Sequence, residues 1–198
     1  MSGAVESDGR VRCAWIDESR LAPADFVLYR DYHDTEWGRP LRDSTALFER
    51  VSLEAFQSGL SWLVILRKRE NFRRAFDGFD VERVARYTER DVTRLMADAG
   101  IVRNRAKIEA TVANAQATAD LADSGVGLAE LLWSFAPPPR ARPVGFADVP
   151  ASSPESTAMA KELKRRGFRF VGPTTAYALM QATGMVDDHT ADCWVPRA

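Results

Sequence analysis

The chain contains two cysteines and two histidines, namely Cys13, His33, His189 and Cys193. Thiolate sulfur and imidazole nitrogen are preferred zinc ligands, and a Cys2His2 set forms a closed tetrahedral site with no open position for water. His189 and Cys193 are spaced i, i+4, which on a helix places both side chains on one face. The pattern therefore predicts a structural metal site that joins the N-terminal and C-terminal segments.

Other interpretations of these four residues stay open at this point. Lone cysteines are often inert buried thiols, and a lone histidine is often a core or surface group. The step from Cys13 to His33 is not a common zinc-finger spacing. A Cys13–Cys193 disulfide requires an oxidising compartment, which nothing in the sequence indicates.

Glu54 is a second residue with chemical potential. It follows Leu47 and Val51 on the same helical stripe, where an ionised carboxylate is costly unless it is paired or hydrogen-bonded. The partner is either another part of the protein or a ligand that donates hydrogen bonds. Trp62 and the aromatic-rich segment 28–38 are core residues in the simplest interpretation. A carboxylate among aromatic rings also suits a flat, donor-bearing base.

The segment 164–173 predicts a glycine-bounded turn between two helices. Gly172 allows the backbone to approach a ligand closely, and the N–H groups at the start of the next helix can bind an anion. We expect Phe168, Phe170 and Val171 to anchor this turn in the core.

Three clusters of basic residues occur in a chain of nearly neutral charge. They are residues 161–169, residues 67–74, and the group Arg103, Arg105 and Lys107. Such clusters fit sequence-independent contact with phosphates. Basic residues are also favoured at helix C-termini by the helix dipole alone, so a solvated helix end is the alternative.

Helices must position these groups, since no segment shows sustained period-2 alternation. Caps and periodicity predict helices that begin near Ser44 and at Ser61, Thr88, Arg103, Leu128, Ser156 and Pro173. Six of the ten prolines fall between Pro137 and Pro154, which predicts a long extended connection. We expect an all-α protein of about eight to ten short helices.

Length and composition bound the remaining possibilities. The chain has 198 residues, 45% hydrophobic residues and a formal net charge of −1. This composition fits one globular domain and excludes a disordered or collagenous protein. No apolar run approaches the ~18 residues of a membrane span, and the start lacks a secretory signal. We expect residues 1–12 to form a disordered tail, residues 13–198 to form a single domain with two lobes, and the protein to be a cytoplasmic monomer.

Several of these motifs together resemble the 3-methyladenine DNA glycosylase I family, in order and at compatible spacing over nearly the whole chain. The motifs are Cys13-Ala14-Trp15, Tyr32-His33-Asp34-Thr35-Glu36-Trp37-Gly38, Leu53-Glu54, Gly59-Leu60-Ser61-Trp62, Lys164-Arg165-Arg166-Gly167-Phe168, and Asp188-His189 with Cys193. The resemblance implies an all-α helix-hairpin-helix DNA glycosylase fold, with the paired helices at about 155–184.

The resemblance also implies roles for individual residues. Cys13, His33, His189 and Cys193 would hold a structural Zn²⁺. Glu54 would be the catalytic acidic residue that contacts the base, Trp62 would stack on it, and Tyr32, Tyr29 and Trp15 would complete the pocket. Gly167, Arg169, Val171, Gly172 and Thr174 would contact DNA.

The implied function is excision of 3-methyladenine from alkylated double-stranded DNA. Asp188, next to a metal ligand, is interpreted as supporting that ligand rather than acting in catalysis. Leu60 is expected in the core, with insertion into the DNA stack as the alternative. Two other functions stay open: a non-catalytic zinc-containing module that binds damaged DNA, and a nucleosidase acting on free nucleosides.

Overall fold

The computed structural model describes residues 5–197 as an assembly of helices with no extended strand in that range. The α-helices are α1 (Pro23–Thr35), α2 (Ser44–Gln57), α3 (Trp62–Ala75), α4 (Val81–Ala85), α5 (Glu89–Ala97), α6 (Arg105–Asp123), α7 (Leu128–Trp133), α8 (Pro154–Arg165) and α9 (Pro173–Ala182). Two 3-10 helices, Asp77–Phe79 and Phe146–Asp148, complete the set. The expected all-α class is confirmed.

The helix starts follow the capping residues of the sequence. The Asp43 carboxylate accepts from the Ala46 N–H at the start of α2, and the Ser61 hydroxyl accepts from the Val64 N–H at the start of α3. Thr88 forms the predicted capping box at α5, and Pro173 is the first residue of α9. The sequence analysis did not delimit α1 and α4.

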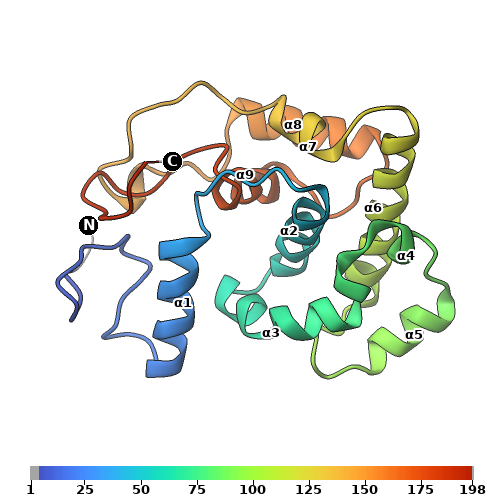
Figure 1. Ribbon diagram of the computed structural model, residues 1–198, viewed down its shortest axis with the longest axis horizontal. Coiled ribbons are helices and arrows are strands. Elements are labelled where there is room, and N and C mark those ends of the chain that lie inside the picture. The colour runs from blue at the N-terminus through green and yellow to red at the C-terminus, as the bar shows by residue number, and fades with distance from the viewer. Residues whose placement is uncertain (1–4, 198) are drawn as a thin grey trace.

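Helix α2 lies at the centre of the molecule and packs against α3, α6, α7 and α9 (Figure 1). Its apolar side chains, including Leu47, Phe48 and Phe56, are fully buried. Because α2 ends at Gln57 inside this core, the residues of its last turn are held in a fixed position beside α9. Helix α1 packs on α3 at one end of the molecule.

The two ends of the described chain lie on the same side of the molecule, beside α1 (Figure 1). Residues 1–4 of the predicted tail lie outside the described residues. Within residues 5–12, Val5 and Val11 form an isolated β-bridge, and Arg12 is buried between the carboxylates of Asp8 and Asp34. No helix in residues 5–197 combines the length and apolar character required to cross a membrane. The proposed domain boundaries remain a prediction.

Candidate functional site

The four soft ligands of the sequence meet in one buried cluster. The ligand atoms of Cys13, His33, His189 and Cys193 all lie within 4.8 Å of one another. The Cys193 sulfur is 3.6 Å from His33 Nε2 and 3.5 Å from His189 Nδ1, and the Cys13 sulfur is 3.6 Å from the same Nδ1. The predicted joining of the N-terminal and C-terminal segments is confirmed.

This donor set fits a tetrahedral metal ion. Metal–sulfur bonds of about 2.3 Å and metal–nitrogen bonds of about 2.0 Å place neighbouring ligand atoms about 3.3–3.8 Å apart. The second nitrogen of each imidazole also has a partner, since His33 Nδ1 lies 2.8 Å from Asp34 Oδ1 and His189 Nε2 lies 3.1 Å from the Trp37 carbonyl oxygen. Such contacts orient metal-bound histidines.

The backbone around His189 and Cys193 differs from the expected helix. The last helix ends at Ala182, and residues 188–195 form turns. The turns bring both side chains to the cluster, because the backbone N–H of Cys193 bonds to the carbonyl of Thr190 and that of Trp194 bonds to Val11. The i, i+4 spacing thus predicted the pairing correctly and its backbone wrongly.

Asp188 does not contact the metal cluster through its carboxylate, contrary to the expected support of His189. It accepts hydrogen bonds from the Tyr177 hydroxyl at 2.7 Å, from Gln181 Nε2 at 2.9 Å and from Arg140 at 2.7 Å. These bonds attach α9 to the proline-rich connection. Asp34 and the Trp37 carbonyl occupy the supporting positions instead.

Aromatic residues from three segments surround a cavity beside this cluster. Trp15 lies 4.8 Å from Tyr29 between ring centroids, and Tyr32 lies 5.3 Å from Trp62. The cavity has a volume of 210 Å³, which exceeds the ~150 Å³ that accommodates benzene in a protein interior. All four aromatic residues named in the sequence analysis line it, together with Trp37, Phe146 and Gln181.

Glu54 lies in the wall of this cavity and is 5% exposed. Its carboxylate accepts no hydrogen bond from the described residues. Burial raises the pKa of Glu54 from 4.5 to about 7, against the opposing positive charge of Arg50. The internal salt bridge considered as an alternative is therefore not formed, and the carboxylate is free to accept bonds from a bound molecule. Burial and the charge of Glu54 also raise the pKa of Tyr29 to about 12.

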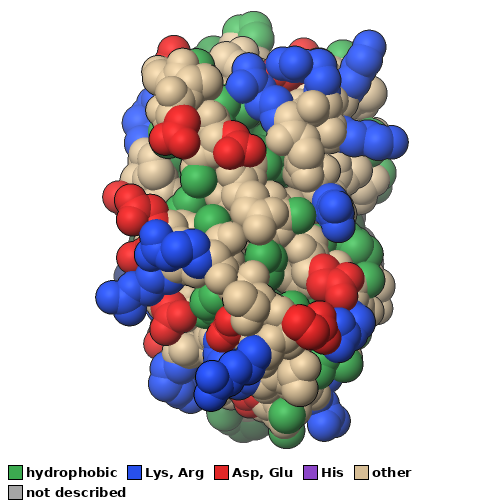
Figure 2. All heavy atoms as spheres, turned by 90° about the vertical axis from the view of Figure 1, so that its right-hand side faces the viewer, with side chains coloured by type: hydrophobic (Ala, Val, Ile, Leu, Met, Phe, Trp, Pro, Cys, Tyr) green, Lys and Arg blue, Asp and Glu red, His purple; other side chains and the backbone are tan. Residues whose placement is uncertain are grey.

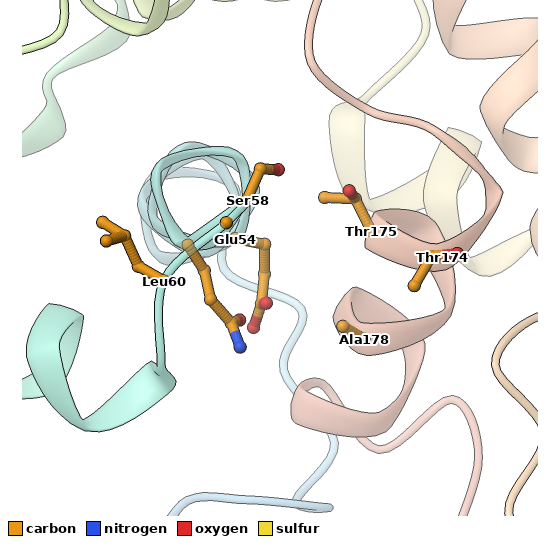
Figure 3. Close-up of a pocket in the computed structure, with 8 residues that line it drawn as sticks. Glu54, Ser58, Leu60, Thr174, Thr175 and Ala178 are labelled. Carbon is orange, nitrogen blue, oxygen red and sulfur yellow. The ribbon is translucent and has the colours of Figure 1, made fainter.

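The cavity continues into an open groove between the end of α2 and the start of α9. This groove has a volume of 320 Å³ and shares Glu54, Gln57 and Ala178 with the aromatic cavity. Figure 3 shows the Glu54 carboxylate directed into the space between the two helices, opposite Thr174 and Ala178. Leu60 stands at the rim and is 42% exposed, so the expectation of a core leucine was wrong.

The turn between α8 and α9 has the expected glycine boundary. Gly167 has a φ of 94°, which only glycine adopts without strain. Phe168 and Val171 are buried as expected, but Phe170 has a φ of 57° and is 43% exposed. The backbone turns Phe170 outward, which the apolar sequence pattern did not reveal.

Asn114 of α6 holds this turn in place. Its side chain is fully buried, accepts from the Arg169 N–H at 2.7 Å and donates to the Arg169 carbonyl at 3.2 Å. The sequence signal for this contact is a single asparagine inside an otherwise alanine-rich helix.

The three basic clusters differ in how their charge is used. In residues 67–74 and in the group around Arg105, several cations bind internal partners: Arg69 pairs with Glu36, Arg73 with Glu49, and the buried Lys107 ammonium donates to the Phe56 and Ser58 carbonyls. Among the described residues, Lys161, Lys164 and Arg169 of the cluster at 161–169 form no ion pair. Over the face drawn in Figure 2, basic side chains gather near the top and alternate with acidic ones lower down. The cluster at the α8–α9 turn thus keeps positive charge that no described carboxylate pairs.

Comparisons with known proteins agree with this arrangement. Residues 24–196 match the family model described as methyladenine glycosylase. The chain is 44% identical over 184 residues to DNA-3-methyladenine glycosylase 1 of Escherichia coli (strain K12), covering 92% of this chain and 95% of that protein.

Solved structures give the same result. A crystal structure of 3-methyladenine DNA glycosylase I superposes with a TM-score of 0.86 at 44% identity, covering 92% of this chain and 98% of the other. The Staphylococcus aureus enzyme, solved to explain its recognition of 3-methyladenine, gives a TM-score of 0.86 at 36% identity, with 94% and 97% covered. The chain belongs to the 3-methyladenine DNA glycosylase I family.

Proposed function

We propose that this protein excises 3-methyladenine from alkylated double-stranded DNA by hydrolysing the N-glycosidic bond. The observation that carries the proposal is Glu54, a buried carboxylate without a protein hydrogen-bond partner in an aromatic cavity of fitting size. The 44% identity to DNA-3-methyladenine glycosylase 1 of Escherichia coli (strain K12) supports the choice of substrate.

The chemistry of the substrate explains why so simple a site suffices. Methylation at N3 makes adenine cationic, so the glycosidic bond is weakened and the base departs as a neutral molecule. The reaction needs less acid–base assistance than removal of an ordinary base, and recognition becomes the main task. The ionised Glu54 accepts hydrogen bonds from the exocyclic N–H edge, and Trp62 stacks on the ring.

The polar side-chain groups of the pocket also favour a base as ligand. The indole Nε1–H of Trp62 is buried and finds no hydrogen-bond partner within residues 5–197. Such a group is costly unless a ligand or water accepts its hydrogen. Tyr29 and Tyr32 contribute hydroxyl groups, and Trp15 closes the aromatic wall. A purine offers both donors and acceptors to these groups.

The base reaches the pocket only after the nucleotide leaves the helical stack, which costs a few kcal/mol. Leu60 at the pocket rim fills the gap left in the duplex. The α8–α9 turn binds the phosphate backbone through Gly167, Arg169, Val171, Gly172 and Thr174, where free N–H groups at the start of α9 meet unpaired positive charge.

The buried cluster holds a Zn²⁺ ion that is structural. Two thiolates and two imidazoles match zinc in ligand type and number, and four protein ligands leave no place for a reactive water. The ion stabilises the junction of the two ends beside the pocket, while Glu54 and the aromatic residues act on the base.

One assay separates the proposal from its two alternatives. The protein is incubated with duplex DNA containing 3-methyladenine and, in parallel, with free 3-methyladenosine, and released bases are identified by chromatography. We expect base release from DNA alone. Binding of DNA with no released base indicates a damage-binding module, and release from the free nucleoside indicates a nucleosidase; either result contradicts the proposal.

Two variants test the assigned site. Glu54→Gln and Trp62→Ala are expected to slow excision strongly, with Trp62→Ala also weakening binding of free 3-methyladenine by about 5-fold to 150-fold through lost stacking. Folding is checked by circular dichroism. Wild-type rates in both folded variants would remove Glu54 and Trp62 from the site.

A further inference from the structure

A buried cation lies directly behind the base pocket. Arg50 is on α2, one turn before Glu54, and is 8% exposed. Its Nη1 donates a hydrogen bond to the Tyr32 hydroxyl at 3.0 Å. Its guanidinium carbon is 5.2 Å from the ring centroid of Trp62 and 5.3 Å from that of Tyr32. Arg50 therefore contacts two walls of the pocket from behind, although it is not among the residues that line the cavity.

The charge of Arg50 is compensated by several groups at a distance rather than by one close ion pair. Its nearest carboxylate oxygen belongs to Glu36, at 3.6 Å. Glu36 already accepts two close hydrogen bonds from Arg69, at 2.6 and 2.8 Å. Against the opposing effect of burial, the surrounding charges, with Glu54 and Glu36 among them, raise the pKa of Arg50, so Glu54 is itself one of the groups that hold the guanidinium at this place.

The bond from Arg50 has a consequence for the hydroxyl of Tyr32. A phenol oxygen accepts through its lone pairs and carries a single hydrogen. Because the guanidinium is only a donor, it occupies the acceptor side of this oxygen and leaves the O–H hydrogen for another partner. Tyr32 lines the cavity, and no described residue accepts a bond from its hydroxyl, so this hydrogen is available to an acceptor on a bound base.

Arg50 also determines the electrostatics around Glu54. The titratable groups facing this carboxylate are Tyr29 and Tyr32 of α1 and Arg50 of α2. Trp62 of α3 and the pocket residues of α9, Ala178 and Gln181, carry no charge. Burial raises the pKa of Glu54 and Arg50 lowers it, so loss of Arg50 would move the ionisation of Glu54 to higher pH.

We propose that Arg50 is a positioning residue of the base pocket, which fixes the Tyr32 hydroxyl as a donor toward the base and keeps Glu54 ionised as the acceptor. The Tyr32 hydroxyl then donates to an acceptor of an aminopurine, and the Glu54 carboxylate accepts from a donor on the same edge of the base. This inference rests on the proposed excision of 3-methyladenine.

The test compares Arg50→Met, which keeps volume and removes charge, with Arg50→Lys, which keeps charge and loses the planar guanidinium. Single-turnover excision from 3-methyladenine DNA is measured between pH 5 and 9. We expect Arg50→Met to lose at least tenfold in rate at pH 7 and to shift the acid limb of the profile to higher pH. Arg50→Lys is expected to restore the position of that limb with only part of the rate.

Arg94→Met is the matched control. Arg94 also lies beside a tyrosine, with its guanidinium carbon 5.5 Å from the Tyr87 ring centroid, but on α5, at the other end of the molecule from α1 (Figure 1). It is expected to keep the wild-type profile.

A second comparison isolates the hydroxyl. In a Tyr32→Phe background, which lacks the hydroxyl, Arg50→Lys is expected to cause no further loss of rate. If Arg50→Met does not fold, this comparison and the pH profile of Arg50→Lys carry the test. A folded Arg50→Met with wild-type rate and acid limb, or an Arg50→Lys rate equal to wild type, overturns the role of Arg50. Failure of the wild-type protein to release the base overturns the proposed function instead.

Discussion

Glu54 sits in a place that favours binding of a ligand at a cost to the stability of the free protein. It is buried on the inner side of α2, accepts no hydrogen bond from the described residues, and has a pKa raised to about 7 by burial. At neutral pH about half of the molecules carry the charge. A bound donor would stabilise the ionised form, so binding of the base and ionisation of Glu54 support each other.

The free-energy cost of burying the ionised Glu54 carboxylate predicts a pH-dependent gain in stability for Glu54→Gln. Because the pKa of Glu54 in the folded state lies above its unfolded value of 4.5, the penalty is absent below pH 4.5 and builds up as the pH rises through about 7. The variant should exceed wild type by up to about 3 kcal/mol at pH 8 and by little at pH 5. Urea unfolding at both pH values measures the difference. Glu109→Gln, on the exposed face of α6, is the control, and an equal gain at both pH values would contradict the prediction.

At the scale of elements, the two glycines of the α8–α9 turn are required for different reasons. Gly167 has a φ of 94°, whereas Gly172 has a φ of −84° and open space where a side chain would project. Gly167 is therefore required by the backbone. Gly172 is required only if something outside the described chain approaches it.

We therefore predict different effects for two alanine variants. Gly167→Ala should destabilise the protein by about 1–3 kcal/mol through backbone strain. Gly172→Ala should leave stability unchanged and weaken DNA binding, because the added methyl group would collide with the phosphate backbone. Thermal unfolding and binding of duplex DNA at fixed salt measure the two effects. Wild-type DNA affinity for a folded Gly172→Ala protein would remove this turn from the interface.

The helices were predictable where local signals mark them, and less so elsewhere. Four helix starts are marked by a capping residue or a first-turn proline, and each of these helices begins there in the structure. The residues are Asp43, Ser61, Thr88 and Pro173. Helix α4 has only five residues, is capped by Asp80 and packs on α6, and so short a segment shows no apolar periodicity. The grouping of Cys13, His33, His189 and Cys193 was predictable from residue type and from the family resemblance, whereas the turns that carry His189 and Cys193 depend on contacts with the distant N-terminal segment.

The pocket was predictable only in part for a related reason. Glu54 and Trp62 stand out by residue type and spacing. Trp37 and Phe146 line the same cavity from segments more than 100 residues apart, and Arg50 reaches it from behind. Periodicity describes the face of one helix, so it does not show which faces of different helices enclose a space.

At the scale of the whole molecule, the metal cluster is the main connection between the two ends of the chain. Arg12, Asp34 and His33 form a continuous chain of polar contacts that leads from the N-terminal segment to the cluster. The aromatic residues Trp15 and Trp37 pack both on the cluster and on the main core. The wall of the aromatic cavity is thus attached to the Cys2His2 cluster.

Removal of the metal should consequently loosen the ends before it affects the helical core. We predict that the purified protein contains one zinc ion per chain, and that chelation or Cys193→Ser lowers Tm by about 10 °C. Excision should persist, at a reduced level, in protein that stays folded. Atomic absorption, calorimetry and the base-release assay measure these three quantities. A strict proportion between activity and bound metal, with no change in structure, would contradict a structural role.

The position of His189 and Cys193 after the last helix also orders the events of synthesis. Within residues 5–197, every α-helix ends before these two side chains, so the helical body does not require them in order to assemble. Capture of an ion is then the closing event of maturation. Without the ion, the protein would accumulate as a folded body with open ends, and later addition of the metal would complete it without refolding.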